Sequence, residues 1–543
     1  MTFTRRMFLT RVAQAGGYQA TYRAMQALGL LASVAEASPL PELSKNFGAG
    51  KKVVILGGGI AGLVSAYELH KAGFSCTVLE ARERPGGRNW SVRNGTKVEF
   101  TDGTVQECSW EEGNYLNAGP ARLPSIHKII LGYCEELGVP LEVEINTSRS
   151  TLMQADALNQ GKPVEQRQVI HDTRGYLSEL LAKAISQHSL DQALSKEDAE
   201  RLLDFLEDFG DLSEGYRYTG STRGGYVESP GAGPVGGTPH SPLSLHELLI
   251  ANLSKGEFYE EQIDWQATMF QPVGGMDRIP YAFAKSLGDI VQYKTVVKEI
   301  RKTSNGVRVV YTKAGSANTQ TLEADYCICT LPVSILRDLD SDFSLEMKQA
   351  FSALRMASLF KIGWEAPRFW EKDYNIYGGI SFLKQPVDLV WYPSNGLFTK
   401  RGILLSGFNF ETNDGANSSS LTPRADDPSF SAIGTPTEFG KLPSMEAKLE
   451  ASRAAVELLH PGHGKSLAKP IYVSWSKIPY SLGCLAINGG GPSITSAYAQ
   501  LSQPDGRLFI AGDYVSHLVG WQEGAALAAH RAIAGIAAHM KHA

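Results

Sequence analysis

The sequence predicts an α/β fold in which a parallel sheet carries α+β insertions, and three observations predict it. Near the start, an apolar run, a glycine-rich turn, a periodic helix and a second apolar run form one strand–helix–strand unit. At the end, "GRLFIAGD" predicts a strand and a turn, and an alanine-rich helix follows. The long middle is helical and mixed. We therefore expect one domain assembled from both ends of the chain, with insertions between its parts.

Length and charge narrow the class of protein. A chain of 543 residues is too long for one hydrophobic core, so two or three domains are expected. The net charge is −5, and no long basic run follows residue 38, which argues against nucleic-acid binding. Six scattered cysteines form no disulfide framework, and Cys327 and Cys329 lack the second pair that a zinc site needs. His460 and His463 are separated by Pro461 and Gly462, which predicts a surface turn and no metal.

The N-terminus resembles a twin-arginine export signal. Arg5 and Arg6 precede a weakly apolar stretch, and small residues stand at Ala35 and Ala37. We therefore expect residues 1–37 to direct export to the periplasm or the medium. Later segments stay below the roughly 18 consecutive apolar residues that indicate a membrane span.

The elements follow in order. Lys51 to Leu56 predicts a buried parallel strand, Ile60 to Ala72 a helix that ends at Gly73, and Ser75 to Glu80 the next strand. The later expectations are helices over 123–137 and 176–209, a Gly- and Pro-rich loop over 219–244, a hairpin over 291–311 with "SNG" at its turn, and a short buried strand in "ADYCICTLP".

The first turn carries a dinucleotide motif. Gly57, Gly59 and Gly62 form G-x-G-x-x-G between strand and helix, which permits a tight turn, close approach to a pyrophosphate and packing of helix on strand. Glu80 ends the second strand, where an acid binds ribose hydroxyls. The motif alone does not distinguish NAD from FAD.

The continuation "ARERPGGR" resembles the second fingerprint of the flavin amine oxidase superfamily. "QPVGGMDRIP", "VVKEI", "WSKIPYSLGC" and "RLFIAGDYVS" resemble further segments of that family, in the family's order. The resemblance implies FAD as the cofactor, and its implied contacts are Gly57, Gly59, Ile60, Ala61, Gly62, Glu80, Ala81, Arg82, Gly86, Gly87, Arg88, Gly119, Pro120, Ala121, Arg122, Val297, Trp475, Gly512, Asp513, Gly520 and Trp521.

The same resemblance implies a domain plan. It predicts a Rossmann-like FAD-binding domain of the glutathione-reductase and amine oxidase type, a mixed-sheet substrate domain and a helical domain. The expected bounds are 51–125, 268–335 and 476–543 for the FAD-binding domain, 126–267 for the helical substrate-entry domain, and 336–475 for the substrate-binding domain.

One segment indicates the substrate. "NAGPARLP" resembles the "GPMRLP" of bacterial L-amino acid oxidases, whose arginine binds the substrate α-carboxylate, so the role falls on Arg122. A guanidinium pairs with a carboxylate through two parallel hydrogen bonds and would reject plain amines. The alternative is a structural arginine paired with Glu111 or Glu112.

Three more residues have implied substrate roles. "LVWYPSN" resembles a segment whose tyrosine binds the carboxylate, which favours Tyr392, with Trp391 as the alternative. Gly520 and Trp521 match a pair that contacts the amino group through a backbone carbonyl and closes the pocket with an aromatic face.

Lys361 matches the family lysine that holds a water at the flavin, so it is a catalytic candidate beside Arg122. No histidine suits a base near Arg223 before His240, and no protein base is assigned. Cys484 resembles the cysteine that monoamine oxidases bond to flavin, but Leu485 follows it in place of the family's tyrosine. Non-covalent FAD is therefore expected.

Together the motifs predict an L-amino acid oxidase: an L-amino acid, water and O₂ give a 2-oxo acid, ammonia and hydrogen peroxide. The alternatives are a tryptophan 2-monooxygenase-like enzyme, a mono- or polyamine oxidase, and a non-catalytic FAD-binding protein. The resemblance also implies a homodimer. The preferred side chain of the substrate is not predicted.

Overall fold

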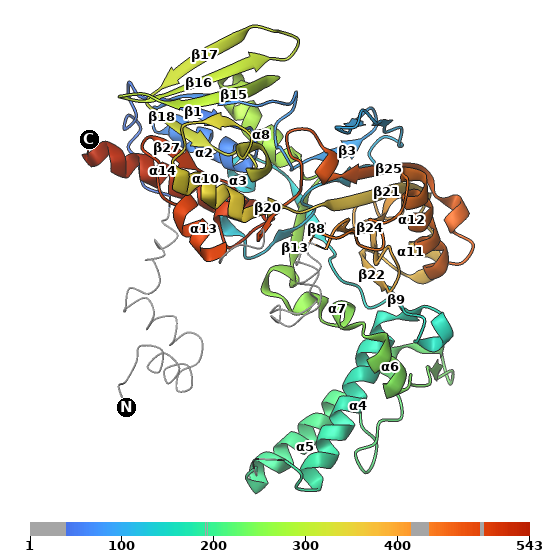
Figure 1. Ribbon diagram of the computed structural model, residues 1–543. Helices are drawn as coiled ribbons and strands as arrows, with labels where there is room; N and C mark the ends of the chain where they lie inside the picture. Colours follow the sequence, from blue (N-terminus) through green and yellow to red (C-terminus); the bar gives the residue numbers. More distant parts are fainter. Residues whose placement is uncertain (1–39, 191, 193, 414–433, 489–493, 543) are drawn as a thin grey trace. The chain divides into compact units, whose positions relative to one another are not determined.

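The computed structural model describes residues 40–190, 192, 194–413, 434–488 and 494–542 (Figure 1). The twin-arginine segment 1–37 therefore lies outside the described residues. The chain divides into two compact units, and each is assembled from separate stretches of sequence. Unit 1 comprises residues 1–87, 280–355 and 488–543, and unit 2 comprises residues 88–279 and 356–487.

Unit 1 contains a five-stranded parallel sheet. Its order is β14 (Val291–Gln292), β2 (Ser75–Leu79), β1 (Lys52–Leu56), β18 (Tyr326–Cys329) and β27 (Leu508–Ile510). The four residues from Val53 to Leu56 are completely buried, as expected for the central strand of a parallel sheet. The helices α2 (Ile60–Lys71) and α14 (Gln522–His542) pack against one another.

The predicted strand–helix–strand unit is confirmed to within about one residue at each boundary. Gly73 follows α2 with φ +86°, the left-handed conformation expected just after a helix. The first strand of unit 1 and the last one thus lie in one sheet, although some 450 residues separate them along the chain.

A second sheet of unit 1 is antiparallel in its main part. It consists of β15 (Thr295–Lys302), β16 (Val307–Lys313), β17 (Thr319–Ala324) and the short β19 (Asp340–Ser341). The hairpin predicted over 291–311 is present but begins at Thr295, because residues 291 and 292 join the parallel sheet as β14. Further helices here are α8 (Arg278–Leu287), which begins just before the unit does, α9 (Val333–Leu336), α10 (Leu345–Ala353) and α13 (Ile494–Leu501).

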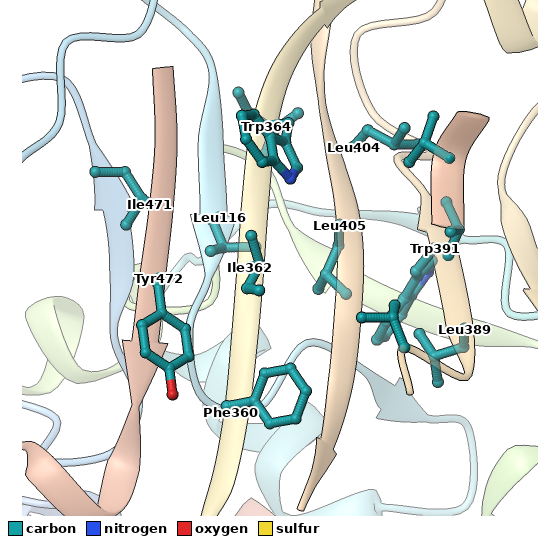
Figure 2. Close-up of a cluster of buried hydrophobic side chains, with 14 of the residues drawn as sticks. Leu116, Phe360, Ile362, Trp364, Leu389, Trp391, Leu404, Leu405, Ile471 and Tyr472 are labelled. Atoms are coloured by element: carbon teal, nitrogen blue, oxygen red, sulfur yellow. The ribbon is translucent and has the colours of Figure 1, made fainter. Parts of the chain in front are cut away.

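Unit 2 is built on a seven-stranded mixed sheet. In order across the sheet, its strands are β10 (Val164–Glu165), β9 (Leu152–Gln154), β22 (Gly379–Leu383), β23 (Leu389–Tyr392), β24 (Arg401–Phe410), β21 (Leu359–Pro367) and β25 (Ala468–Ser474). Figure 2 shows part of its core, where Phe360, Ile362 and Trp364 of β21 lie between Tyr472 of β25 and Leu405 of β24. The helices α11 (Phe369–Tyr374) and α12 (Met445–Leu459) belong to the same unit.

A three-stranded sheet of unit 2 carries Glu144, which lies near the predicted substrate-binding residue Arg122. It consists of β7 (Leu123–Pro124), β13 (Met269–Pro272) and β8 (Leu141–Glu144). The helix predicted over 123–137 is accordingly shorter, and α3 covers Lys128–Glu136. The expectation was wrong at its start because Leu123 and Pro124 pair with β13 instead.

The helix predicted over 176–209 is in fact a pair, α4 (Gln166–Ser186) and α5 (Lys196–Gly210), which pack together (Figure 1). Ser195 starts α5 as its N-cap, since its side chain accepts a hydrogen bond from the Asp198 N–H. Residues 219–244 form the expected loop, with only β11 (Tyr226–Glu228), β12 (Thr238–Pro239) and one helical turn as regular structure. The short helices α6 (Leu245–Ala251) and α7 (Ser254–Glu257) follow.

The two units divide the chain differently from the three expected domains. Residues 88–125, 268–279 and 476–487 were expected with the FAD-binding parts but lie in unit 2, and residues 336–355 lie in unit 1. The helical insertion 126–267 is not a separate unit, because it packs with the mixed sheet of unit 2. Within the described residues, no helix is both long and apolar enough to cross a membrane.

Candidate functional site

In unit 1, the glycine-rich turn leaves an open space at the start of α2. Gly57 has φ +102°, and a Cβ added to Gly62 would lie 2.0 Å from the Gly57 carbonyl oxygen. A Cβ added to Gly59 would meet nothing within 4 Å. Ile60 and Ala61 form the first turn of the helix. The N-terminus of α2 is therefore available to a phosphate, and its free N–H groups favour an anion.

Glu80 is held in a fixed position beside this turn. Its Oε2 accepts a hydrogen bond from the Gly58 N–H at 2.7 Å, and its Oε1 accepts one from the Arg82 N–H at 2.8 Å. Ala81 lies between them in the chain, and Arg82 Nη1 is also 3.7 Å from the same carboxylate. Each carboxylate oxygen keeps a further lone pair, which suits ribose hydroxyls.

The "RPGGR" segment packs on the glycine-rich turn. The Gly86 N–H donates to the Gly58 carbonyl at 2.7 Å, and Arg84 donates to the Gly87 carbonyl at 2.9 Å. Gly86 also forms a parallel bridge with Gly59. The two fingerprints predicted from sequence are thus neighbours in the fold.

The other predicted residues of unit 1 lie at corresponding strand ends. Gly512 and Asp513 follow β27, as Gly57 follows β1 and Glu80 follows β2, so all stand at the carboxyl edge of the parallel sheet. The Asp513 carboxylate is buried and accepts from the Gly520 N–H at 2.9 Å. Trp521 directly precedes α14.

Val297 belongs to β15, which approaches Glu80 through its first residue. The Thr295 N–H donates to the Glu80 carbonyl at 2.8 Å, and Val297 is half-buried two residues further along.

In unit 2, Lys361 is anchored on the segment that leads to Arg122. Its Nζ donates to the Asn117 carbonyl at 2.7 Å and to the Gly119 carbonyl at 2.6 Å. The side chain is 1% exposed. Burial, with a smaller contribution from the nearby Arg122 charge, lowers the pKa of Lys361 to about 7. The amine can therefore change its charge near neutral pH.

The same segment is enclosed by other predicted cofactor residues. The Trp475 indole N–H donates to the Ala118 carbonyl at 2.9 Å, and Arg88 donates to the Cys484 carbonyl. A Cβ on Gly119 would lie 1.9 Å from the Arg88 carbonyl oxygen, so glycine is required there. Pro120 and Ala121 are half-buried between Gly119 and Arg122. Unit 2 thus brings the predicted Arg88, Gly119, Lys361 and Trp475 together.

Arg122 has one edge engaged and one edge free. Its Nη1 donates to Asn146 Oδ1 at 2.8 Å and to the Tyr259 hydroxyl at 2.7 Å. Among the described residues, its Nε and Nη2 have no hydrogen-bond partner. The guanidinium carbon lies 4.7 Å from the ring centroid of Trp391 and 5.4 Å from that of Trp265. A carboxylate can therefore use the free edge while aromatic rings exclude water around it.

The acids proposed as structural partners do not pair with Arg122. Glu111 lies 3.7 Å from Arg401, and Glu112 is exposed. The nearby acid is Glu144, which the sequence analysis missed. It is 4% exposed, and among the described residues its carboxyl oxygens make no well-formed hydrogen bond, with the Trp391 side chain as the one donor that acts on them. Burial raises the pKa of Glu144 to about 7, although the Arg122 charge and the neighbouring Trp391 side chain oppose the shift.

Of the two candidates on this strand, Trp391 lies against Arg122, and the hydroxyl of Tyr392 is engaged elsewhere. The Tyr392 hydroxyl lies 2.8 Å from Ser381 Oγ and 2.6 Å from His460 Nε2, and the side chain is completely buried. Adjacent residues of a strand point to opposite faces, so Trp391 faces Arg122 when Tyr392 does not.

The prediction for the histidine pair needs one correction. Pro461 and Gly462 do form an exposed turn, but His460 is completely buried. Burial lowers the pKa of His460 to about 3, so the imidazole is neutral and binds the Tyr392 hydroxyl. No group of metal-ligating side chains occurs in the part of the chain that the structure describes.

The chain is similar to known proteins over most of its length. Residues 60–536 match the family model described as flavin-containing amine oxidoreductase. An L-amino-acid oxidase of Siganus canaliculatus is 26% identical over 507 residues, which cover 89% of this chain and 85% of that protein. One of Notechis scutatus scutatus is 25% identical over 492 residues, which cover 87% and 84%.

Two solved structures with the same fold are named as amine oxidases. A putrescine oxidase bound to putrescine superposes with a TM-score of 0.56 at 18% identity and covers 91% of this chain and 99% of its own. A cyclohexylamine oxidase from Brevibacterium oxydans IH-35A gives 0.56 at 15% identity, with 90% and 99% covered. The α/β fold class predicted from sequence is confirmed.

Proposed function

Because the chain belongs to the family of flavin-containing amine oxidoreductases, we propose that it is an FAD-dependent L-amino-acid oxidase. The products would be a 2-oxo acid, ammonia and hydrogen peroxide, formed from an L-amino acid, water and O₂. Relatives named L-amino-acid oxidase along most of the chain support this proposal. The observation that carries it is the free edge of the buried Arg122 guanidinium.

The flavin is assigned as FAD because unit 1 fits a dinucleotide. The open space at Gly59 accommodates a phosphate, and Glu80 is positioned for a ribose. When bound, a flavin supplies the redox chemistry, since it accepts a hydride and passes electrons to O₂. In this proposal Gly57 to Gly62, Glu80, Val297, Asp513 and their neighbours in unit 1 hold the dinucleotide.

Arg122 would bind the α-carboxylate and thereby fix the substrate carbon. Asn146 and Tyr259 hold Nη1, so the guanidinium is oriented before the substrate arrives. The substrate amine has to be neutral when its neighbouring C–H bond breaks, so we expect the rate to rise with pH.

Lys361 would act on O₂ and water. Two of its three N–H bonds are fixed by backbone carbonyls, which leaves one to hold a water molecule. A pKa of about 7 lets it carry a proton on or off at neutral pH.

The decisive experiment mixes the purified holoprotein anaerobically with matched ligands and follows the flavin absorbance near ~450 nm, where loss of colour reports reduction. The pairs L-phenylalanine with phenethylamine, and L-lysine with cadaverine, differ only in the carboxylate. Bleaching by an amino acid and not by its amine supports the proposal. Bleaching by an amine alone would assign the chain to the amine oxidases, which the putrescine and cyclohexylamine oxidase structures favour as the second candidate.

Product analysis separates an oxidase from a tryptophan 2-monooxygenase-like enzyme. The oxidase yields a 2-oxo acid and peroxide, whereas the monooxygenase yields an amide and carbon dioxide. Peroxide in an amount equal to the amino acid consumed would support the oxidase.

The FAD is proposed to be non-covalent. Cys484 is half-buried, and its backbone is held by Ala357 and Arg88. Denaturation in acid followed by filtration should release yellow FAD into the filtrate. Flavin retained on the protein would show a bond to Cys484.

Export and dimerisation complete the proposal. Deleting residues 1–37 should keep the protein in the cytoplasm of the host cell, and light scattering of the mature protein should give twice the mass of one chain.

A further inference from the structure

Glu144 is an unpaired acid inside unit 2. It is the last residue of β8, where its backbone is opposite Met269 of β13, and it is 4% exposed to solvent. Both carboxyl oxygens are buried and make no well-formed hydrogen bond among the described residues, where the Trp391 side chain is the one donor that acts on them. Buried acids are rarely left in this state, because an uncompensated charge in a protein interior is strongly destabilising.

The acid lies beside the proposed carboxylate site. Asn146, two residues further along the chain, accepts a hydrogen bond from Arg122. Glu144 lies close enough to Arg122 for the positive charge to lower the pKa of its carboxyl group. Trp391 contacts this region from the mixed sheet, and its ring is also the nearest ring to Arg122.

When a substrate carboxylate binds Arg122, the ionised form of Glu144 loses electrostatic stabilisation. A carboxylate on the free edge of Arg122 neutralises the one cation known to act on Glu144. Two carboxylates, that of Glu144 and that of the substrate, then lie near one guanidinium. Either a second positive charge must compensate Glu144, or Glu144 must take up a proton. The substrate's α-ammonium cannot remain that charge, because it must lose its proton before the C–H bond breaks. It is also attached to the carbon that carries the carboxylate, so it stays near Arg122.

We propose that Glu144 determines specificity by binding the positively charged end of the substrate side chain, so that basic L-amino acids are preferred. This inference rests on the proposed amino-acid oxidase function and names the substrate class of that same site. A side-chain ammonium or guanidinium would pair with the carboxylate, and the aromatic rings of Tyr259, Trp265 and Trp391 also favour a cation nearby.

The test compares charged substrates with neutral ones of similar shape. For the holoenzyme, kcat/KM is measured with L-lysine against L-norleucine and with L-arginine against L-citrulline. We expect a preference of about 30-fold or more for each charged member, the range for a buried charge pair. Glu144→Gln should lose most of that preference, chiefly through a higher KM for lysine, while norleucine is used as well as before or better.

Glu142→Gln is the matched control. Glu142 precedes Glu144 by two residues on β8, is partly buried and accepts a hydrogen bond from Gln271 at 3.1 Å. The same substitution there should leave the lysine preference unchanged. Glu144→Asp, which keeps the charge on a shorter chain, should retain part of it. The flavin content of each variant verifies folding.

The outcomes separate the two proposals. Equal or better use of norleucine by the unmodified enzyme overturns the Glu144 assignment and leaves the oxidase proposal intact. An unchanged lysine preference in a folded Glu144→Gln variant overturns it as well. Bleaching by no amino acid at all overturns the oxidase proposal, and the Glu144 assignment with it.

Discussion

At the scale of single residues, Arg122 carries the substrate assignment and gives the most direct test. Replacing it with alanine removes both donors that a carboxylate would use, so kcat/KM for amino acids should fall at least about 30-fold. Arg122→Lys should recover little, because an ammonium lacks the fork that pairs with two oxygens. Steady-state kinetics with flavin content as a second readout check this prediction.

Arg201→Ala is the control for this series, since Arg201 is exposed on α5 and pairs only with Glu197. It should have no effect. An Arg122→Ala variant that binds flavin and retains its activity on amino acids would show that the carboxylate is bound elsewhere.

For Lys361 we expect an effect on the reaction with O₂ and not on substrate binding. In Lys361→Met, amino acids should still bleach the flavin, but the return of colour with O₂ should slow by about 100-fold or more, the range for losing a positioned proton donor. Because burial lowers the pKa to about 7, the amine is charged below that pH and neutral above it. The O₂ reaction of the unmodified enzyme should therefore slow as pH rises through 7, since a positive charge stabilises the negative charge that builds on oxygen.

Stopped-flow measurement of both half-reactions from pH 6 to 9 checks this, with Lys372→Met on the exposed side of α11 as the control. Loss of the pH step in Lys361→Met is the expected signature. A variant whose O₂ reaction is as fast as before would remove Lys361 from the mechanism.

Sequence reasoning found the charged residues of the site but not their surroundings. Arg122 and Lys361 stand in recognisable motifs, whereas Asn146, Tyr259 and Glu144 reach Arg122 only through tertiary folding. The choice between Tyr392 and Trp391 depended on which face of β23 the pocket lies on. That register is set by pairing with β22 and β24, which no local pattern reveals.

At the scale of elements, the turn between β1 and α2 contains two glycines with different roles. Gly59 leaves space for a ligand, whereas Gly62 allows close packing of the backbone. Gly59→Ala should fold normally, because its backbone is extended and a Cβ there meets nothing. It should nevertheless lose FAD, since the Cβ fills the space that a pyrophosphate needs. Gly62→Ala should instead destabilise unit 1, because its Cβ would lie 2.0 Å from the Gly57 carbonyl oxygen.

Thermal unfolding of the apoproteins and the ratio of flavin to protein absorbance separate the two effects. If Gly59→Ala binds FAD with unchanged affinity, the phosphates do not lie at this helix N-terminus.

Elements were predictable where the local pattern was strong. The periodic helix before Gly73 and the apolar strands of the parallel sheet were located within about a residue. The break between α4 and α5 was missed, because residues 176–209 are rich in helix formers and the interruption depends on the packing of one helix against the other. The strand β7 was likewise assigned to a helix, since its partner β13 lies about 145 residues away.

At the scale of the whole molecule, both units combine distant parts of the chain. The sequence predicted the union of the two ends, because each end carries half of a recognisable sheet. It did not predict that residues 88–125 and 476–487 belong with the mixed sheet. Their contacts, such as Arg88 with Cys484, join segments more than 350 residues apart.

The pH dependence of the free energy of unfolding should reveal the buried Glu144 independently of any measurement of catalysis. The pKa of Glu144 rises from 4.5 to about 7 on folding, so between these pH values the folded protein holds a proton that the unfolded chain has released. The folded state is therefore favoured at low pH, and the contribution of Glu144 to the free energy of unfolding falls as pH rises from 4.5 to 7. Above pH 7 the penalty reaches roughly 3 kcal/mol, from 1.36 kcal/mol per pKa unit.

Glu144→Gln abolishes this titration. The variant should unfold at a higher temperature than the unmodified protein at pH 8, and the difference should shrink towards pH 5. Comparing the two proteins at each pH cancels the other ionisable groups. A variant less stable at pH 8, or a difference independent of pH, would mean that Glu144 has a partner. The predicted gain in stability identifies a charge that the fold maintains at a cost, as is typical of groups kept for binding a ligand.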